Sequence, residues 1–111
     1  MATISNLYVD QGSFFRTYVT VSGSDGAVVD LTGYTAAAQM RKSYSSSVAY
    51  NFQISISNPT QGRVRIELGS EYSRTIPAGR YLYDLEVTDS NGEKLRIIEG
   101  IVTINPEITK V

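Results

Sequence analysis

The stretch PAGRYLYDLEVTDSNG, residues 77–92, decides the fold class of this chain. From Tyr81 to Val87 every second residue is aromatic or aliphatic, and the residues between them include Asp84 and Glu86. Successive side chains of a strand point to opposite faces of a sheet, so this period of two predicts a β-strand with one buried face. The Asp-Ser-Asn-Gly sequence that follows is typical of a tight turn between two strands.

The same alternation occurs in other parts of the chain. Residues 52–57 and 63–68 alternate strictly, and less regular runs occupy residues 3–9, 14–22 and 34–42. One wet face per strand favours antiparallel sheets over a parallel sheet covered by helices. The pattern predicts an all-β fold, an immunoglobulin-like antiparallel β-sandwich of seven to eight strands, with residues near 3–9 as an edge strand. A small β-barrel is the alternative.

Three further segments lead to local predictions. Residues 69–76 lack alternation and are expected to form a crossing loop with one helical turn. Residues 94–104 change phase, which predicts a β-bulge at Glu99-Gly100. Tyr81 opens the strand after the Pro-Ala-Gly turn, where sandwiches place a tyrosine whose hydroxyl bonds back to the preceding backbone. We therefore expect a tyrosine-corner contact there.

Composition excludes several kinds of site. A chain of 111 residues is the size of one domain, so we expect residues 1–111 to form a single domain. There is no cysteine and no histidine, which removes the common nucleophile triads and the usual zinc and haem ligands, so we predict no metal and no cofactor. The net charge of −1 argues against nucleic acid, and no apolar stretch is long enough for a membrane helix.

Acidic residues on the strand of residues 80–88 allow two interpretations. Asp84 and Glu86 share the predicted outer face with Arg80, where a carboxylate pair would suit glycoside hydrolysis. We favour a solvated charged face, because a flat sheet face offers no cleft that would shift a carboxylate pKa. Acidic residues in the turns are expected to cap their own backbone and not to bind calcium. We predict that the protein is not an enzyme.

Tyrosine is unusually frequent, with eight in the chain. Tyr81 and Tyr83 alternate with core residues, whereas others fall in or beside polar loops that also carry serine and arginine. Such residues are typical of adaptable binding surfaces. Ordinary packing at strand ends is the alternative. The candidate interaction surface, for a protein or sugar partner, comprises Arg41, Tyr44, Tyr50, Tyr72, Arg74 and Arg80.

Segments distributed from Asp10 to Thr109 carry a family resemblance through their order and spacing. They are Asp10-Gln11-Gly12 followed by Phe15, residues 30–34, 40–42, 62–68, 75–85 and 99–104, and residues 106–109. In these segments the chain resembles a family of small bacteriophage virion proteins, and it is similar to the immunoglobulin-like N-terminal domain of phage baseplate upper proteins.

The resemblance implies a structural component of a tailed-bacteriophage virion, located in the tail, baseplate or neck or decorating the capsid. Its partners would be other virion proteins and copies of itself, and we expect residues 3–9 or 106–111 to pair with a neighbour's sheet edge. The N-terminus lacks a secretory signal pattern, so the expected location is the virion after synthesis in the host cytoplasm. The alternative is a carbohydrate-binding or adhesion module, in which Tyr44, Tyr50 or Tyr72 stacks on a glycan.

Overall fold

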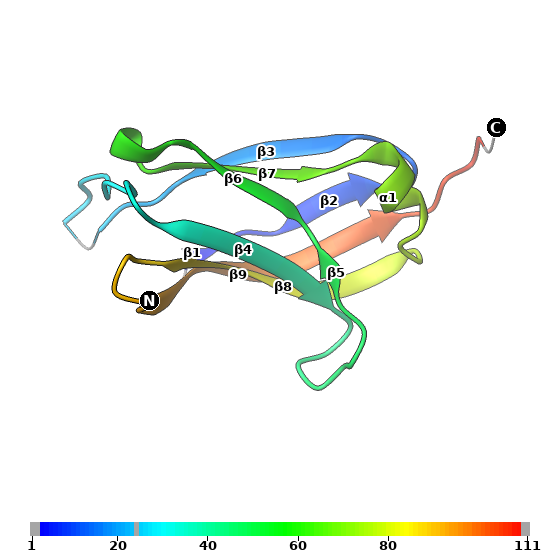
Figure 1. The fold of residues 1–111 in the computed structure, drawn as a ribbon. Coiled ribbons are helices and arrows are strands. Elements are labelled where there is room, and N and C mark those ends of the chain that lie inside the picture. The colour runs from blue at the N-terminus through cyan, green and yellow to red at the C-terminus, as the bar shows by residue number, and fades with distance from the viewer. Residues whose placement is uncertain (1–2, 24, 110–111) are drawn as a thin grey trace.

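Two β-sheets packed face to face make up the protein (Figure 1). The computed structural model describes residues 3–23 and 25–109. Almost all of its regular structure is β-strand, which confirms the all-β prediction. The elements in chain order are β1 (Thr3–Ile4), β2 (Leu7–Asp10), β3 (Phe15–Thr20), β4 (Thr35–Arg41), β5 (Tyr50–Asn51), β6 (Gln53–Asn58), the 3-10 helix η1 (Pro59–Gln61), β7 (Arg63–Leu68), α1 (Ser70–Arg74), β8 (Gly79–Thr88) and β9 (Lys94–Asn105).

The strand order is that of an immunoglobulin-like sandwich. The larger sheet has the order β1-β9-β8-β4-β5, with β2 also paired to β9, and the smaller sheet has the order β3-β7-β6. If β1 and β2 together are strand A, then β3, β7 and β6 are strands B, E and D, and β9, β8 and β4 are strands G, F and C. The predicted sandwich is therefore confirmed. The described residues form nine strands and not the seven to eight expected, and two of the nine, β1 and β5, are only two residues long.

The N-terminal strands lie at a sheet edge, as predicted, but their pairing is parallel and not antiparallel. Both β1 and β2 run parallel to β9, with Leu7 beside Val102 and Asp10 beside Asn105. The other strand pairings among the described residues are antiparallel. A wholly antiparallel sandwich is thus wrong for this edge. No hairpin joins the first strand to the last, so no turn imposes an antiparallel pairing on them.

The core lies between the two sheets and follows the alternation of the sequence. Along β8 the side chains from Tyr81 to Val87 alternate between buried and half-buried, as predicted. Val64, Ile66 and Leu68 of β7 face them from the smaller sheet and are also buried. Burial of each such side chain contributes about 1.5–3 kcal/mol to folding.

The β-bulge in β9 lies earlier than predicted. Arg96 and Ile98 both pair with β8, whereas Ile97 between them has no partner there. The bulge expected at Glu99-Gly100 is therefore at Ile97, where the phase of apolar residues changes. The glycine that suggested the other position has a different cause: a Cβ on Gly100 would lie 2.2 Å from the carbonyl oxygen of Ser5.

The connection from β7 to β8 has the predicted form. Residues 69–76 contain the short helix α1 and then return to the larger sheet. The hydroxyl of Tyr81 donates a hydrogen bond to the carbonyl oxygen of Pro77 at 2.6 Å, which confirms the predicted tyrosine corner. This contact fixes the crossing segment to the first residues of β8.

Candidate functional site

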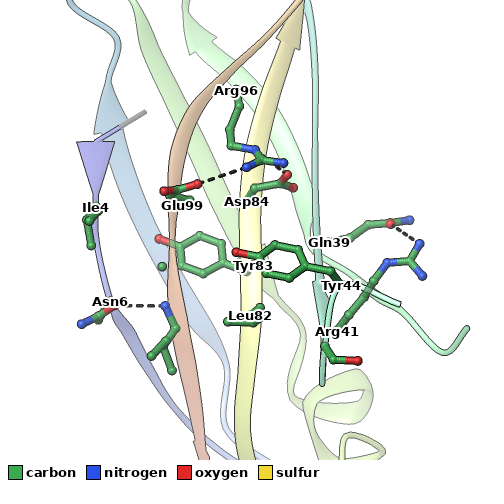
Figure 2. Close-up of a pocket in the computed structure, with 13 residues that line it drawn as sticks. Ile4, Asn6, Gln39, Arg41, Tyr44, Leu82, Tyr83, Asp84, Arg96 and Glu99 are labelled. Atoms are coloured by element: carbon green, nitrogen blue, oxygen red, sulfur yellow. Dashed lines mark hydrogen bonds and ion pairs between the residues drawn. The ribbon is translucent and has the colours of Figure 1, made fainter. Parts of the chain in front are cut away.

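The larger sheet carries a groove on the face that points away from the core (Figure 2). The groove has a volume of about 480 Å³ and crosses β9, β8 and β4, with the N-terminal segment at one side and the loop after β4 at the other. Its lining residues are Ile4, Asn6, Gln39, Arg41, Ser43, Tyr44, Leu82, Tyr83, Asp84, Arg96, Glu99, Gly100 and Ile101. The expectation that this sheet face is flat and has no cleft is therefore wrong.

Strand register places the lining residues in rows across the sheet. Leu82 on β8 lies between Ile101 on β9 and Arg41 on β4, which forms one row. Asp84, two residues further along the same face, lies between Glu99 and Gln39. We call Leu82 and Ile101 the apolar row, and Asp84, Glu99 and Gln39 the polar row. The two rows are neighbours because residues two apart on a strand share a face.

The bulge at Ile97 sets up a charged cluster in the polar row. Beyond the bulge, Asp84 lies opposite Glu99; without the extra residue it would lie opposite Ile98. Like charges placed directly opposite each other destabilise a sheet. Arg96 lies between the two carboxylates, with its Nε 3.0 Å from Asp84 Oδ2 and an Nη 3.1 Å from Glu99 Oε2 (Figure 2).

These two contacts affect the pKa of Arg96. The hydrogen bond to Glu99 and the negative charge of Asp84 raise the pKa of Arg96 above its ordinary value. An arginine guanidinium stays protonated in proteins, so Arg96 balances one of the two carboxylates. Glu86, which the sequence paired with Asp84, is not among the lining residues; the second acidic residue of the groove is Glu99.

A hydrogen-bonded loop carries Tyr44 over the groove. Arg41 donates from Nη1 to the carbonyl oxygen of Ser46 at 2.5 Å and from Nη2 to Gln39 Oε1 at 3.2 Å. The amide of Gln39 in turn donates to Asn51 Oδ1 at 2.8 Å. These contacts tie residues 43–46 to the strand they follow. The Tyr44 ring extends across β8 between Leu82 and Asp84, and the residue remains 82% exposed (Figure 2).

The N-terminal segment forms the opposite wall. Asn6 accepts a hydrogen bond from the backbone N–H of Ile101 at 3.0 Å, and Ser5 accepts one from the hydroxyl of Tyr83 at 2.5 Å. Gly100 allows this segment to approach the backbone of β9. The wall is thus fixed from both β8 and β9, and it presents Ile4 and Asn6 to the groove.

The structure divides the six residues of the predicted interaction surface. Arg41 and Tyr44 line the groove, whereas the other four lie elsewhere. Arg80 is exposed at the start of β8, opposite Thr103. Arg41 and Tyr44 are therefore the only two that this groove brings together.

Tyr50, Tyr72 and Arg74 make contacts within the protein. Tyr50 packs against the core edge-on to Tyr81, with ring centroids 5.9 Å apart. The hydroxyl of Tyr72 accepts a hydrogen bond from the backbone N–H of Asn51 at 2.9 Å. Arg74 forms ion pairs at 3.4 Å with Glu71 and with Glu107.

The described residues support neither a metal site nor a membrane-spanning helix. Among residues 3–23 and 25–109, no group of three or more acidic, histidine or cysteine residues is placed to hold a metal ion. Within the same residues, no helix is both long and apolar enough to cross a membrane.

Comparison with known proteins supports the fold alone. No protein-family model and no curated protein matches the chain. It is similar to an internalin-like protein of Listeria monocytogenes, with a TM-score of 0.50 and 9% identity over 94% of this chain and 28% of that one. It also aligns with a family 123 glycoside hydrolase from Clostridium perfringens, with a TM-score of 0.44 and 11% identity over 97% of this chain and 24% of that one. The chain thus spans about a quarter of each protein, and at such identity the first likeness shows a shared β-sandwich and the second carries no argument.

Proposed function

We propose that the protein is a structural component of a tailed-bacteriophage virion, in the tail, baseplate or neck or on the capsid, and that it acts through protein–protein contacts. The proposal rests on the family resemblance, and one structural observation carries it. Three of the segments that bear the resemblance, which are far apart in the sequence, meet at one end of the sandwich. Residues 10–12, 75–85 and 106–109 are joined there through a single side chain.

That side chain is Gln11, which follows β2. Its Nε2 donates to the carbonyl oxygen of Ile76 at 2.9 Å, and its Oε1 accepts from the backbone N–H of Glu107 at 3.0 Å. An amide side chain has both a donor and an acceptor, so one glutamine satisfies two backbone groups from two other segments. The match between these segments and the family pattern is thus a match to one interlocked unit.

Gly12 adds a second requirement at the same place. Its backbone has a φ of +84°, and a Cβ there would lie 2.4 Å from Glu107 Oε2. Its N–H donates to the hydroxyl of Ser73 at 3.0 Å, and that hydroxyl donates to the carbonyl oxygen of Ser13 at 2.9 Å. Ser73 is fully buried. Agreement in residues with such linked constraints is more specific than agreement in alternating strand residues, which supports the resemblance.

A sandwich with open edges suits repeated assembly contacts. On the described residues, β3 and β6 each pair with β7 alone, so each leaves one side of its backbone unpaired. Exposed apolar side chains, among them Tyr8, Phe14 and Ile108, lie outside the groove. Symmetric repetition multiplies weak contacts of this kind into a stable assembly. The proposed partners are copies of this chain and other virion proteins.

The proposed role is non-enzymatic and places the protein in the virion after synthesis in the host cytoplasm. An antibody against the purified protein would test it on phage particles banded in a density gradient. We expect the chain to co-band with the major capsid protein and to remain bound after washing in high salt. Absence of the chain from washed particles, with the capsid protein present, would overturn the proposal.

A further inference from the structure

We propose that the groove beside Tyr44 is a binding site for an uncharged oligosaccharide. This inference is independent of the assembly role, because it concerns the outer face of the larger sheet and not the end fixed by Gln11. Three properties of the groove lead to it: an exposed aromatic ring near an apolar row, a balanced set of charges, and a central strand, β8, that is paired on both sides.

The first property is the combination of Tyr44 with the apolar row near it. The ring of Tyr44 lies in front of β8 near Leu82 (Figure 2). Leu82 and Ile101, which pair across β8 and β9, are half-buried and line the same groove. Sugar rings have apolar C–H faces that pack against aromatic rings, while their hydroxyls remain at the edge. A tyrosine offers both an apolar ring and a polar hydroxyl for such a ligand. The groove volume of about 480 Å³ is also within the roughly 300–1,000 Å³ of small-molecule sites, and the groove crosses three strands.

The second property is the charge balance of the groove as a whole. Two carboxylates, Asp84 and Glu99, and two guanidinium groups, Arg41 and Arg96, line the groove, so their formal charges cancel. Arg96 is paired with both carboxylates, and Arg41 is hydrogen-bonded to Gln39 and Ser46. A charged ligand would have to disturb these pairs. A hydroxyl both donates and accepts, and can use the remaining lone pairs and N–H groups without adding charge.

The third property excludes the two other common classes of polymer. A peptide that adds to a sheet needs an edge with unpaired backbone groups, but β8 in the middle of the groove is paired on both sides, with β4 and with β9. Nucleic acid needs an excess of positive charge to offset its phosphates, and the groove has none. Recognition along β8 therefore depends on side chains, which suits the hydroxyls of a neutral glycan.

Binding of a defined panel of sugars to the full-length protein tests the inference. The probes are cello-, malto-, manno- and N-acetylchito-hexaose as neutral ligands, and hexagalacturonate as a charged one. Amide chemical shifts in NMR titrations report both affinity and location. We expect at least one neutral hexaose to bind and to shift the amides of residues 43–46, 82–84 and 99–101. No binding to any neutral hexaose, or binding of hexagalacturonate alone, would overturn the inference.

Matched variants separate the groove from the rest of the surface. We expect Tyr44→Ala to weaken binding about tenfold or more, because the variant removes the aromatic face against which a sugar ring would pack. Tyr8→Ala is the control, because Tyr8 is an exposed tyrosine of the same sheet that lies outside the groove. It is expected to bind like the wild type. Asp84→Asn provides a second variant of the groove that keeps the side-chain shape, and it is also expected to weaken binding. Equal affinity of Tyr44→Ala, Asp84→Asn and wild type would contradict the inference even if the sugar binds.

Discussion

Tyr81 and Pro77 are joined by a hydrogen bond of 2.6 Å from the phenol hydroxyl to the backbone carbonyl oxygen. The Tyr81 ring is buried, and Lys42 Nζ lies 4.4 Å from its centroid on one side while Tyr50 meets it edge-on. The contact therefore anchors the segment that crosses from the smaller sheet to the larger one.

Removal of this hydroxyl is expected to weaken the fold without changing it. We predict that Tyr81→Phe lowers the free energy of unfolding by about 1 kcal/mol, because the ring still packs but the Pro77 carbonyl loses its donor. Urea unfolding followed by circular dichroism measures this difference. Tyr44→Phe removes a hydroxyl from an exposed tyrosine and serves as the control, with no change expected. Equal stability of both variants would show that the bond contributes nothing.

The two buried tyrosines of β8 predict a loss of stability in alkali. Burial raises the pKa of both Tyr81 and Tyr83 above the ordinary value. Above about pH 10, unfolded tyrosines lose protons that the folded ones retain. Their contribution to stability is therefore fully present below the unfolded pKa and is lost as the pH rises through the folded pKa. Unfolding free energies between pH 8 and 11 should fall, and less steeply in Tyr83→Phe; an identical slope in that variant would contradict the prediction.

Gly100 is predicted to be essential for the attachment of the N-terminal strands. A Cβ at this position would meet the carbonyl oxygen of Ser5, which itself accepts the hydrogen bond from Tyr83. We expect Gly100→Ala to cost about 1–3 kcal/mol of stability and to speed amide hydrogen exchange at Leu7 and Val9. Gly69→Ala is the control, since nothing lies within 4 Å of a Cβ built there. Unchanged exchange in the first variant would refute the close approach.

Local patterns in the sequence predicted most of the fold because they report which side chains are buried. The alternation along residues 80–87 identified β8 correctly, and the phase change between Leu95 and Ile98 correctly indicated a bulge in β9. Its position was assigned to Gly100 because glycine is common at bulges. The true reason for that glycine is the Ser5 backbone, 95 residues away in the chain, which no local pattern reveals.

The groove could not be predicted for a related reason. Asp84 was identified from the sequence, but its partners Glu99 and Arg96 depend on the register after the bulge. A shift of one residue would have turned Ile98 toward the solvent in place of Glu99. The polar loop around it suggests Tyr44, but the sequence does not show that a hydrogen bond from Arg41 to Ser46 ties that loop to β4. Both facts concern three-dimensional geometry, whereas residue type alone suggested each candidate.

Gln11 provides the last prediction, because it links three segments by one side chain. In Gln11→Ala the carbonyl oxygen of Ile76 and the N–H of Glu107 would both lose a partner at a partly buried site. A hydrogen bond contributes about 1 kcal/mol net to stability, so the loss of two predicts a drop in unfolding free energy of about 2 kcal/mol. Gln11→Glu keeps an acceptor for the N–H of Glu107 but places a carboxylate oxygen against the carbonyl oxygen of Ile76, so it should also be less stable than the wild type. Gln53→Ala, an exposed glutamine on β6, is the control, with a change below about 0.5 kcal/mol. Urea midpoints of both Gln11 variants below that of the wild type would support the linked unit that underlies the proposed family relationship, and Gln11→Ala as stable as Gln53→Ala would remove that support.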